Sequence, residues 1–98
     1  MCSLKEGDMG KIKIEKPDAG KLKNLGVDSW PIWEKGVSRF DWSYDEQETC
    51  YILEGKAKVE PEEGEPVEFQ AGDLVTFPKG LNCIWEISSP IRKHYKFG

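Results

Sequence analysis

Two short segments, each punctuated by glycine, carry the side chains whose types and spacing could support chemistry. The first runs from Glu48 to Gly55 and the second from Gly72 to Cys83. Each combines an apolar run with turn residues, which is typical of a short strand bounded by a turn. The interior of a barrel could receive one group from each segment, Glu48 and Cys83. A carboxylate and a thiol are suited to acid–base chemistry or to binding zinc, iron or copper.

The numbers of histidines and cysteines limit the kinds of catalytic or metal site that the chain can form. His94 is the only histidine, which excludes any site that needs two imidazoles from one chain. The three cysteines, Cys2, Cys50 and Cys83, form no Cys-x-x-Cys pair, so a zinc ribbon or a thioredoxin-type motif is excluded. An odd number of cysteines without a secretory signal favours reduced thiols in the cytoplasm.

Length and charge bound the class of protein. The 98 residues suffice for one domain, and 38% are hydrophobic and 33% charged, as in a globular protein. The net charge of -4 argues against nucleic acid as the main partner. No apolar run approaches the roughly 20 residues that span a bilayer. We expect one domain over residues 1–98 with a flexible segment at 1–10, cytoplasmic, or organellar if a targeting segment has been removed.

Turn residues at regular spacing predict an all-β protein with eight to ten short strands. The one helix candidate is short, with Asp18 as N-cap and Gly26 after its last turn. The aromatic-rich stretch 27–34 is expected to be extended, and Gly55 to form a tight turn or a bulge. In chain order, we predict strands at residues 11–15, 37–44, 48–54, 56–60, 67–69, 74–77, 83–87 and 91–97.

The first glycine-punctuated segment resembles the first of the two signature motifs of the cupin superfamily. That motif ends in a glutamate followed, after six residues, by a glycine, and Glu48 and Gly55 have this spacing. The two histidines that precede the glutamate in the motif fall on Trp42 and Tyr44 in this chain. An indole has no lone pair to donate to a metal, and a phenol coordinates only after losing its proton.

The second segment resembles the second cupin motif more closely. Gly72, Pro78 and Gly80 match its glycine, proline and glycine in order and spacing, whereas Cys83 and Ile87 stand at its histidine and asparagine positions. Together the motifs cover about half of the chain. The whole chain resembles small single-domain (RmlC-like) cupins grouped with the (S)-ureidoglycine aminohydrolase cupin domain. This resemblance implies a double-stranded β-helix, or jelly-roll, barrel, and a homodimer is expected.

The resemblance also implies where a site would lie. Cupins usually hold a metal between the two motifs, and only Glu48 and Cys83 remain as competent ligands. Cys50 shares the strand face of Glu48, and His94 could complete a site with zinc, iron, manganese or copper. The absence of any metal is equally open, with Cys50 and Cys83 as small buried hydrophobic residues.

Three further interpretations concern a pocket inside the barrel. Glu48 and Tyr44 are candidate catalytic residues, although Glu48 could also be a paired structural group. Trp42 and Trp85 are candidates for binding a small molecule. Arg92 and Lys93 could bind a ligand carboxylate or, more commonly, pair with surface glutamates.

The function predicted from the sequence is the binding of a small polar metabolite in the barrel. The protein is then either a metal-dependent enzyme or a non-catalytic binding or sensor module with a degenerate metal site. A filled barrel without a pocket is the third alternative. The expected partners are a small-molecule ligand and a second copy of the chain, with no nucleic acid and no membrane.

Overall fold

The computed structural model describes residues 12–98. The predicted flexible segment at residues 1–10, with Cys2, lies outside the described residues. Within residues 12–98 the fold is all-β with a single short helix, as the sequence predicts. The elements, in chain order, are β1 (Lys13–Glu15), α2 (Ala19–Leu25), η1 (Val27–Ser29), β2 (Ile32–Lys35), β3 (Ser38–Ser43), β4 (Glu48–Pro61), β5 (Val67–Gln70), β6 (Leu74–Phe77) and β7 (Asn82–Phe97).

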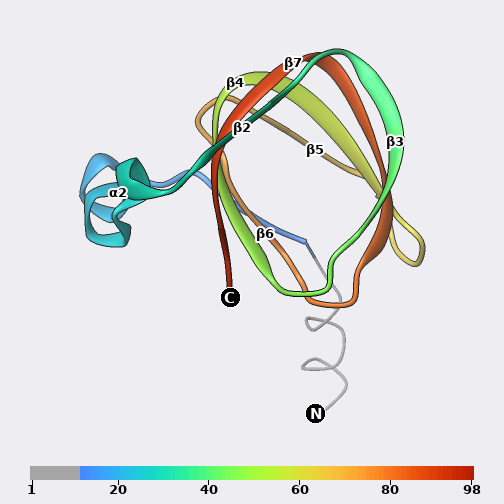
Figure 1. Cartoon of the computed structure of the whole chain (residues 1–98), viewed down its shortest axis with the longest axis horizontal. Coiled ribbons are helices and arrows are strands. Elements are labelled where there is room, and N and C mark those ends of the chain that lie inside the picture. The colour runs from blue at the N-terminus through green and yellow to red at the C-terminus, as the bar shows by residue number, and fades with distance from the viewer. Residues whose placement is uncertain (1–11) are drawn as a thin grey trace.

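The two longest strands, β4 and β7, connect the two halves of the barrel. They pair antiparallel from Glu48 opposite Phe97 to Pro61 opposite Cys83. In one half they are flanked by β6 and β2, with β1 beyond β6, and in the other half by β5 and β3. Figure 1 shows that this path of strands curves into a barrel, with β3 on the opposite side from β6 and β2.

Two pairs of predicted strands are continuous, and this accounts for most of the difference from the expected number. The predicted strands 48–54 and 56–60 are both parts of β4, and 83–87 and 91–97 are both parts of β7. The pairing register shifts between Ile52 and Ala57. Gly55 at this bend has a φ of 99°, and a Cβ on it would lie 2.0 Å from the Pro90 carbonyl oxygen. Gly55 therefore serves as a bulge at which the two backbones touch.

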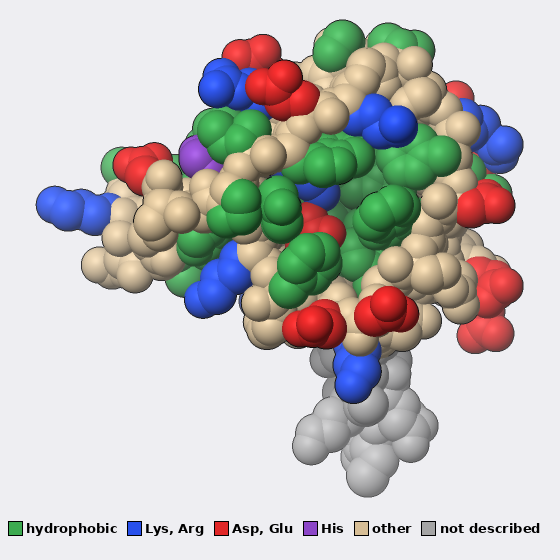
Figure 2. Space-filling model, viewed as in Figure 1, with side chains coloured by type: hydrophobic (Ala, Val, Ile, Leu, Met, Phe, Trp, Pro, Cys, Tyr) green, Lys and Arg blue, Asp and Glu red, His purple; other side chains and the backbone are tan. Residues whose placement is uncertain are grey.

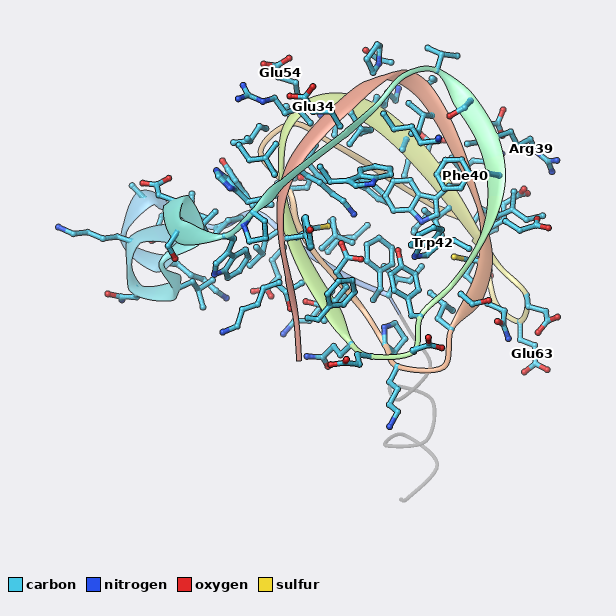
Figure 3. All side chains as sticks on the ribbon, viewed as in Figure 1. Glu34, Arg39, Phe40, Trp42, Glu54 and Glu63 are labelled. Atoms are coloured by element: carbon cyan, nitrogen blue, oxygen red, sulfur yellow. The ribbon has the colours of Figure 1, made fainter. Side chains whose placement is uncertain are left out.

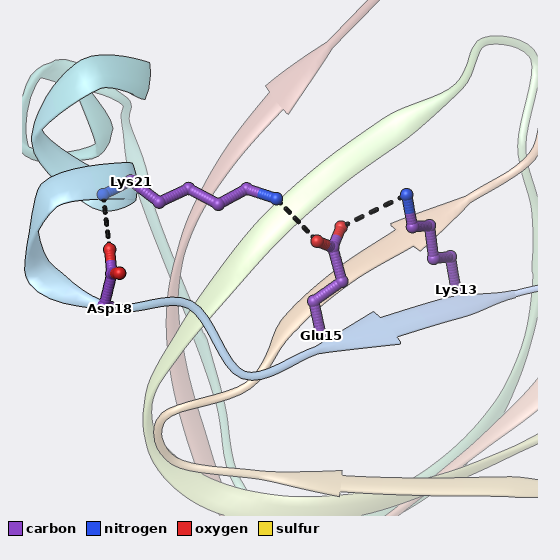
Figure 4. A network of polar contacts seen from close by, with 4 residues as sticks. All are labelled: Lys13, Glu15, Asp18 and Lys21. Atoms are coloured by element: carbon purple, nitrogen blue, oxygen red, sulfur yellow. Dashed lines mark hydrogen bonds and ion pairs between the residues drawn. The ribbon is translucent and has the colours of Figure 1, made fainter.

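The short helix has the ends that the sequence predicts. The Asp18 side chain accepts a hydrogen bond from the Lys21 backbone N–H at 2.8 Å, and Gly26 adopts a φ of 71° after the last turn. The Lys21 ammonium also donates to Glu15 in β1, which ties the helix to the sheet (Figure 4). No helix among residues 12–98 is both long and apolar enough to cross a membrane.

The stretch after α2 differs from the expected extended segment. Its first part, η1, is a 3-10 turn, and only Ile32–Lys35 forms a strand. The turn follows from Gly26, because the Ser29 backbone N–H and side-chain hydroxyl both donate to the Gly26 carbonyl oxygen, at 2.9 and 2.7 Å. These short-range bonds supply an alternative to strand pairing.

The register of β4 against β7 decides which side chains face the interior. Cys50 lies opposite Tyr95 and Ile52 opposite Lys93, whereas the alternate residues, including His94, face outward. The inward side chains form one apolar core around Ile52 and Trp85. Two charged side chains, Glu48 and Lys93, are also buried, with exposed fractions of 4% and 5%.

Candidate ligand-binding site

A cavity of about 220 Å³ opens between strands β2, β3, β4 and β7. Figure 2 shows hydrophobic side chains around a hollow, with basic and acidic atoms visible inside it. In Figure 3, Phe40 and Trp42 lie on the inner side of β3. The residues that line the cavity are Trp33, Phe40, Trp42, Glu48, Trp85, Lys93, Tyr95 and Phe97.

Strand pairing explains why these side chains meet. Residues directly opposite each other in antiparallel strands project from the same face of the sheet. Trp33 of β2 lies opposite Lys93, and Phe40 of β3 lies opposite Trp85. Glu48 at the start of β4 lies opposite Phe97 at the end of β7. Residues far apart in the sequence therefore meet along β7, from Trp85 near its start to Phe97 at its end.

The polar centre of the cavity is an ion pair between Lys93 and Glu48. The Lys93 Nζ atom donates a hydrogen bond to Glu48 Oε2 at 2.7 Å, and the two side chains are 5% and 4% exposed. By contrast, Arg92 pairs with Glu34 at 3.2 Å on the surface, where the side chains are 44% and 65% exposed. Removal of both charges from water is costly, so each depends on the other for its stability in the fold.

Aromatic rings surround the Lys93 ammonium and supply further stabilisation. Its Nζ atom lies 4.9 Å from the ring centroids of both Trp33 and Trp85, and 5.9 Å from that of Phe77. The faces of these rings carry negative potential, which favours a cation that has been removed from water. The geometry explains how a lysine can be buried among apolar side chains.

Tyr44, one of the two predicted catalytic residues, does not line the cavity. Its hydroxyl accepts a hydrogen bond from Trp85 Nε1 at 3.1 Å, and its ring stacks on Phe77 with centroids 4.8 Å apart. Burial, together with the nearby Glu48 carboxylate, raises the pKa of Tyr44 above its usual value. Tyr44 is therefore a neutral phenol that holds the Trp85 indole in place beside the cavity.

The four predicted metal ligands are not brought together. Among residues 12–98, no three His, Cys, Asp or Glu side chains form a group that could hold a metal ion. Glu48 and Cys50 share the inner face of β4, as expected, but His94 faces outward. Its Nδ1 atom lies 2.8 Å from the Trp30 carbonyl oxygen. The register of β7 therefore places His94 on the opposite face of the sheet from Glu48 and Cys50.

Both described cysteines behave as buried, uncharged side chains. Cys50 and Cys83 are free thiols with exposed fractions of 0% and 6%. The Cys83 Sγ atom lies 3.6 Å from the Trp42 carbonyl oxygen, at the opposite end of β7 from Glu48. Burial raises the pKa of Cys83 to about 11 and that of Cys50 to about 12.

We expect these thiols to react slowly with iodoacetamide at pH 8. Only the thiolate reacts, and a pKa near 11 leaves on the order of one thiol in a thousand ionised, so labelling should be about 100-fold slower than in urea. The rate at Cys83 should rise with pH towards 11. Intact-mass spectrometry of a Cys2→Ser variant measures both rates, and rapid labelling of the native protein at pH 8 would contradict the burial.

Sequence reasoning missed the partner of Glu48. It treated Lys93 as a residue that pairs with a ligand or with surface glutamates, and the second alternative describes Arg92 instead. A signal was present, because Lys93 alternates with the apolar residues Ile91, Tyr95 and Phe97. A lysine in the apolar phase of a strand requires a buried partner, and Glu48 was the inward carboxylate already identified.

Comparison with solved structures supports the fold. A DUF861-family protein from Thermotoga maritima is 59% identical, with a TM-score of 0.88 over 90% of this chain and 100% of that chain. The Clostridium difficile EutQ protein is 22% identical, with a TM-score of 0.63 over 86% of this chain and 66% of that chain. For Lactobacillus farciminis oxalate decarboxylase the identity is 21% and the TM-score 0.55, over 92% and 29% of the two chains. The last two comparisons show the fold alone.

A family model gives the most specific assignment. No curated protein matches the chain. The model described as the EutQ-like cupin domain matches residues 22–95, which include both glycine-punctuated segments and every residue that lines the cavity except Phe97. This match confirms the small cupin barrel predicted from the sequence. The chain belongs to the EutQ-like cupin domain family.

Proposed function

We propose that this protein binds a small planar molecule in the cavity between β2, β3, β4 and β7. The observation that carries the proposal is the buried Glu48–Lys93 ion pair, which lines a cavity with aromatic walls. An aromatic cavity with a few polar groups at one place is the usual form of a small-molecule site. The polar groups fix the orientation of a ligand, and the aromatic rings supply most of the contact area.

The alternative that the ion pair is only structural is less well supported. Replacement of a buried ion pair by apolar side chains is often neutral or stabilising, so a pair of charges is a poor means of filling a core. Glu48 and Lys93 also line the cavity, although both side chains are almost fully buried. In that position both charges can reach a bound molecule.

The size and walls of the cavity limit the ligand. Its volume of about 220 Å³ lies below the roughly 300–1,000 Å³ of typical sites for drug-sized molecules. Trp33 and Trp85 meet edge to face, and Phe40 lies nearly parallel to Trp85, with an interplanar angle of 11°. Flat aromatic walls favour one ring or two fused rings over a branched or extended molecule.

Of the two functions expected from the sequence, the geometry favours the non-catalytic binding or sensor module. Tyr44 lies behind Trp85, and the candidate metal ligands do not converge. A catalytic role for Glu48 is a separate hypothesis. The likeness to the ureidoglycine aminohydrolase group is another, and ureidoglycine is the compound that tests it.

The homodimer is also a proposal. It is supported by Ile32, which is exposed on the edge strand β2, and light scattering would measure the mass of the assembly.

A titration with flat fragments tests the proposal. We expect single-ring and fused-ring fragments to shift the amide NMR signals of residues that line the cavity. Trp33→Leu should weaken the best fragment about tenfold, because the variant removes an aromatic wall. Trp30→Leu is the matched control, since Trp30 is a buried tryptophan outside the cavity, and its effect should stay below about twofold. If no fragment shifts the cavity signals, the proposed function is wrong.

A further inference from the structure

We propose that the cavity selects a neutral heterocycle that carries a carbonyl group beside an N–H group, as a lactam ring does. This inference rests on the proposed function and specifies the ligand of the same site. Its basis is a hydrogen-bond donor and an acceptor that lie side by side in the cavity, each with capacity left over. The charges of the donor and the acceptor also cancel.

The donor is the Lys93 ammonium. A lysine ammonium has three N–H donors, and one of them is used by Glu48 Oε2 at 2.7 Å. No second acceptor among residues 12–98 binds Lys93 Nζ; its other neighbours are the faces of Trp33, Phe77 and Trp85. Because Lys93 lines the cavity, a ligand carbonyl can take a free N–H.

The acceptor is the Glu48 carboxylate. Its Oε1 atom receives no hydrogen bond from the described residues. Among these residues, every side-chain nitrogen or oxygen that is fully shielded from solvent has a hydrogen-bond partner, so an oxygen without a partner cannot be fully shielded. Oε1 is therefore accessible rather than sealed in the core, and Glu48 lines the cavity. A carboxylate with an open oxygen among aromatic rings is a strong acceptor for a ligand N–H.

Charge balance disfavours ionic ligands. Glu48 and Lys93 form a neutral pair, so an anion or a cation would bring an uncompensated charge into an apolar cavity. A carboxylate drawn to Lys93 would also lie close to the Glu48 carboxylate, which is 2.7 Å from the ammonium. An ammonium ligand would meet the converse repulsion from Lys93. A neutral ligand avoids both the uncompensated charge and the repulsion.

A lactam edge matches the remaining requirements. Its carbonyl and N–H groups are attached to adjacent atoms of one plane, so both can bond to a donor and an acceptor that are themselves in contact. Its ring is flat, which suits walls formed by Trp33, Phe40 and Trp85. Two parallel hydrogen bonds also give orientation, which stacking alone does not.

The experiment compares four two-ring probes by NMR titration: 2-quinolone, N-methyl-2-quinolone, naphthalene and 2-naphthoate. We expect 2-quinolone to bind at least about tenfold more tightly than the other three, because N-methylation blocks the bond to Glu48 and naphthalene offers neither group. The Glu48→Leu/Lys93→Met variant replaces the ion pair by two apolar side chains. In this variant the preference should fall below about twofold while naphthalene still binds. The Glu34→Leu/Arg92→Met variant, which alters the neighbouring surface pair, should keep the preference.

The outcomes separate this inference from the proposed function. If naphthalene or 2-naphthoate binds the unmodified protein as tightly as 2-quinolone, the lactam inference is wrong and the cavity is still a binding site. Persistence of the quinolone preference in the Glu48→Leu/Lys93→Met variant would also overturn the inference. If none of the four probes shifts the signals of cavity residues, both the inference and the proposed function fail.

Discussion

Replacement of Lys93 by methionine should lower the free energy of unfolding by about 3–5 kcal/mol. The variant leaves the Glu48 carboxylate buried without its hydrogen-bonded cation, and an uncompensated buried charge is one of the few causes of so large a loss. Urea unfolding, followed by tryptophan fluorescence, measures the effect. An effect of this size would be a large part of the stability of a domain of this length.

Two control variants separate the effect of the unpaired buried carboxylate from the effect of losing a cation in general. Arg92→Met removes the neighbouring cation, whose side chain is 44% exposed, and should cost less than about 1 kcal/mol. Glu48→Leu/Lys93→Met removes both charges and should recover most of the stability lost in the single variant. A loss in Lys93→Met as small as that in Arg92→Met, or no recovery in the double variant, would contradict the buried pair.

Replacement of Gly55 by alanine should cost about 4 kcal/mol or abolish cooperative unfolding. The residue has a φ of 99°, and the new Cβ would approach the Pro90 carbonyl oxygen to 2.0 Å and the Ser89 carbonyl oxygen to 2.8 Å. Both atoms belong to the backbone of β7, so no side chain can move aside. The strands β4 and β7 would have to separate at the bend, and this would disturb the pairing that joins the two halves of the barrel.

Two other glycines divide this cost into its parts. Gly72 also has a positive φ, 97°, but has open space around it, so Gly72→Ala should cost only the backbone strain of about 1–2 kcal/mol. Gly36 has open space without such a φ, and Gly36→Ala should change the stability by less than about 0.5 kcal/mol. Equal losses for Gly55→Ala and Gly72→Ala would show that the close approach to Pro90 is unimportant.

The sequence carried most of the information on the fold because local rules and long-range pairing agree. Asp18 and Gly26 bound the helix as capping residues do, and alternation placed Phe40 and Trp42 on one face of β3. What it could not give was the continuity of β4 and β7. Local signals around Gly55 indicate an interruption, and only pairing with a distant strand shows that the chain continues as one bulged strand.

The site was harder to predict because it depends on which strands pair. Alternation put Glu48 and Cys50 on one face and Lys93 in the apolar phase of β7, but it could not show that Lys93 and Glu48 meet. That assignment needs the register of β7, which a sequence does not state. Trp33 enters the cavity for the same reason, since its place opposite Lys93 follows from β2 pairing with the end of β7.

A crystal structure of the protein with bound 2-quinolone tests the central claim most directly. The account predicts electron density for the ring against Trp33 and Phe40, with its carbonyl oxygen within hydrogen-bond distance of Lys93 Nζ and its N–H directed at Glu48. Density for the probe at another surface, with the cavity unoccupied under saturating conditions, would contradict the claim that this cavity is the binding site.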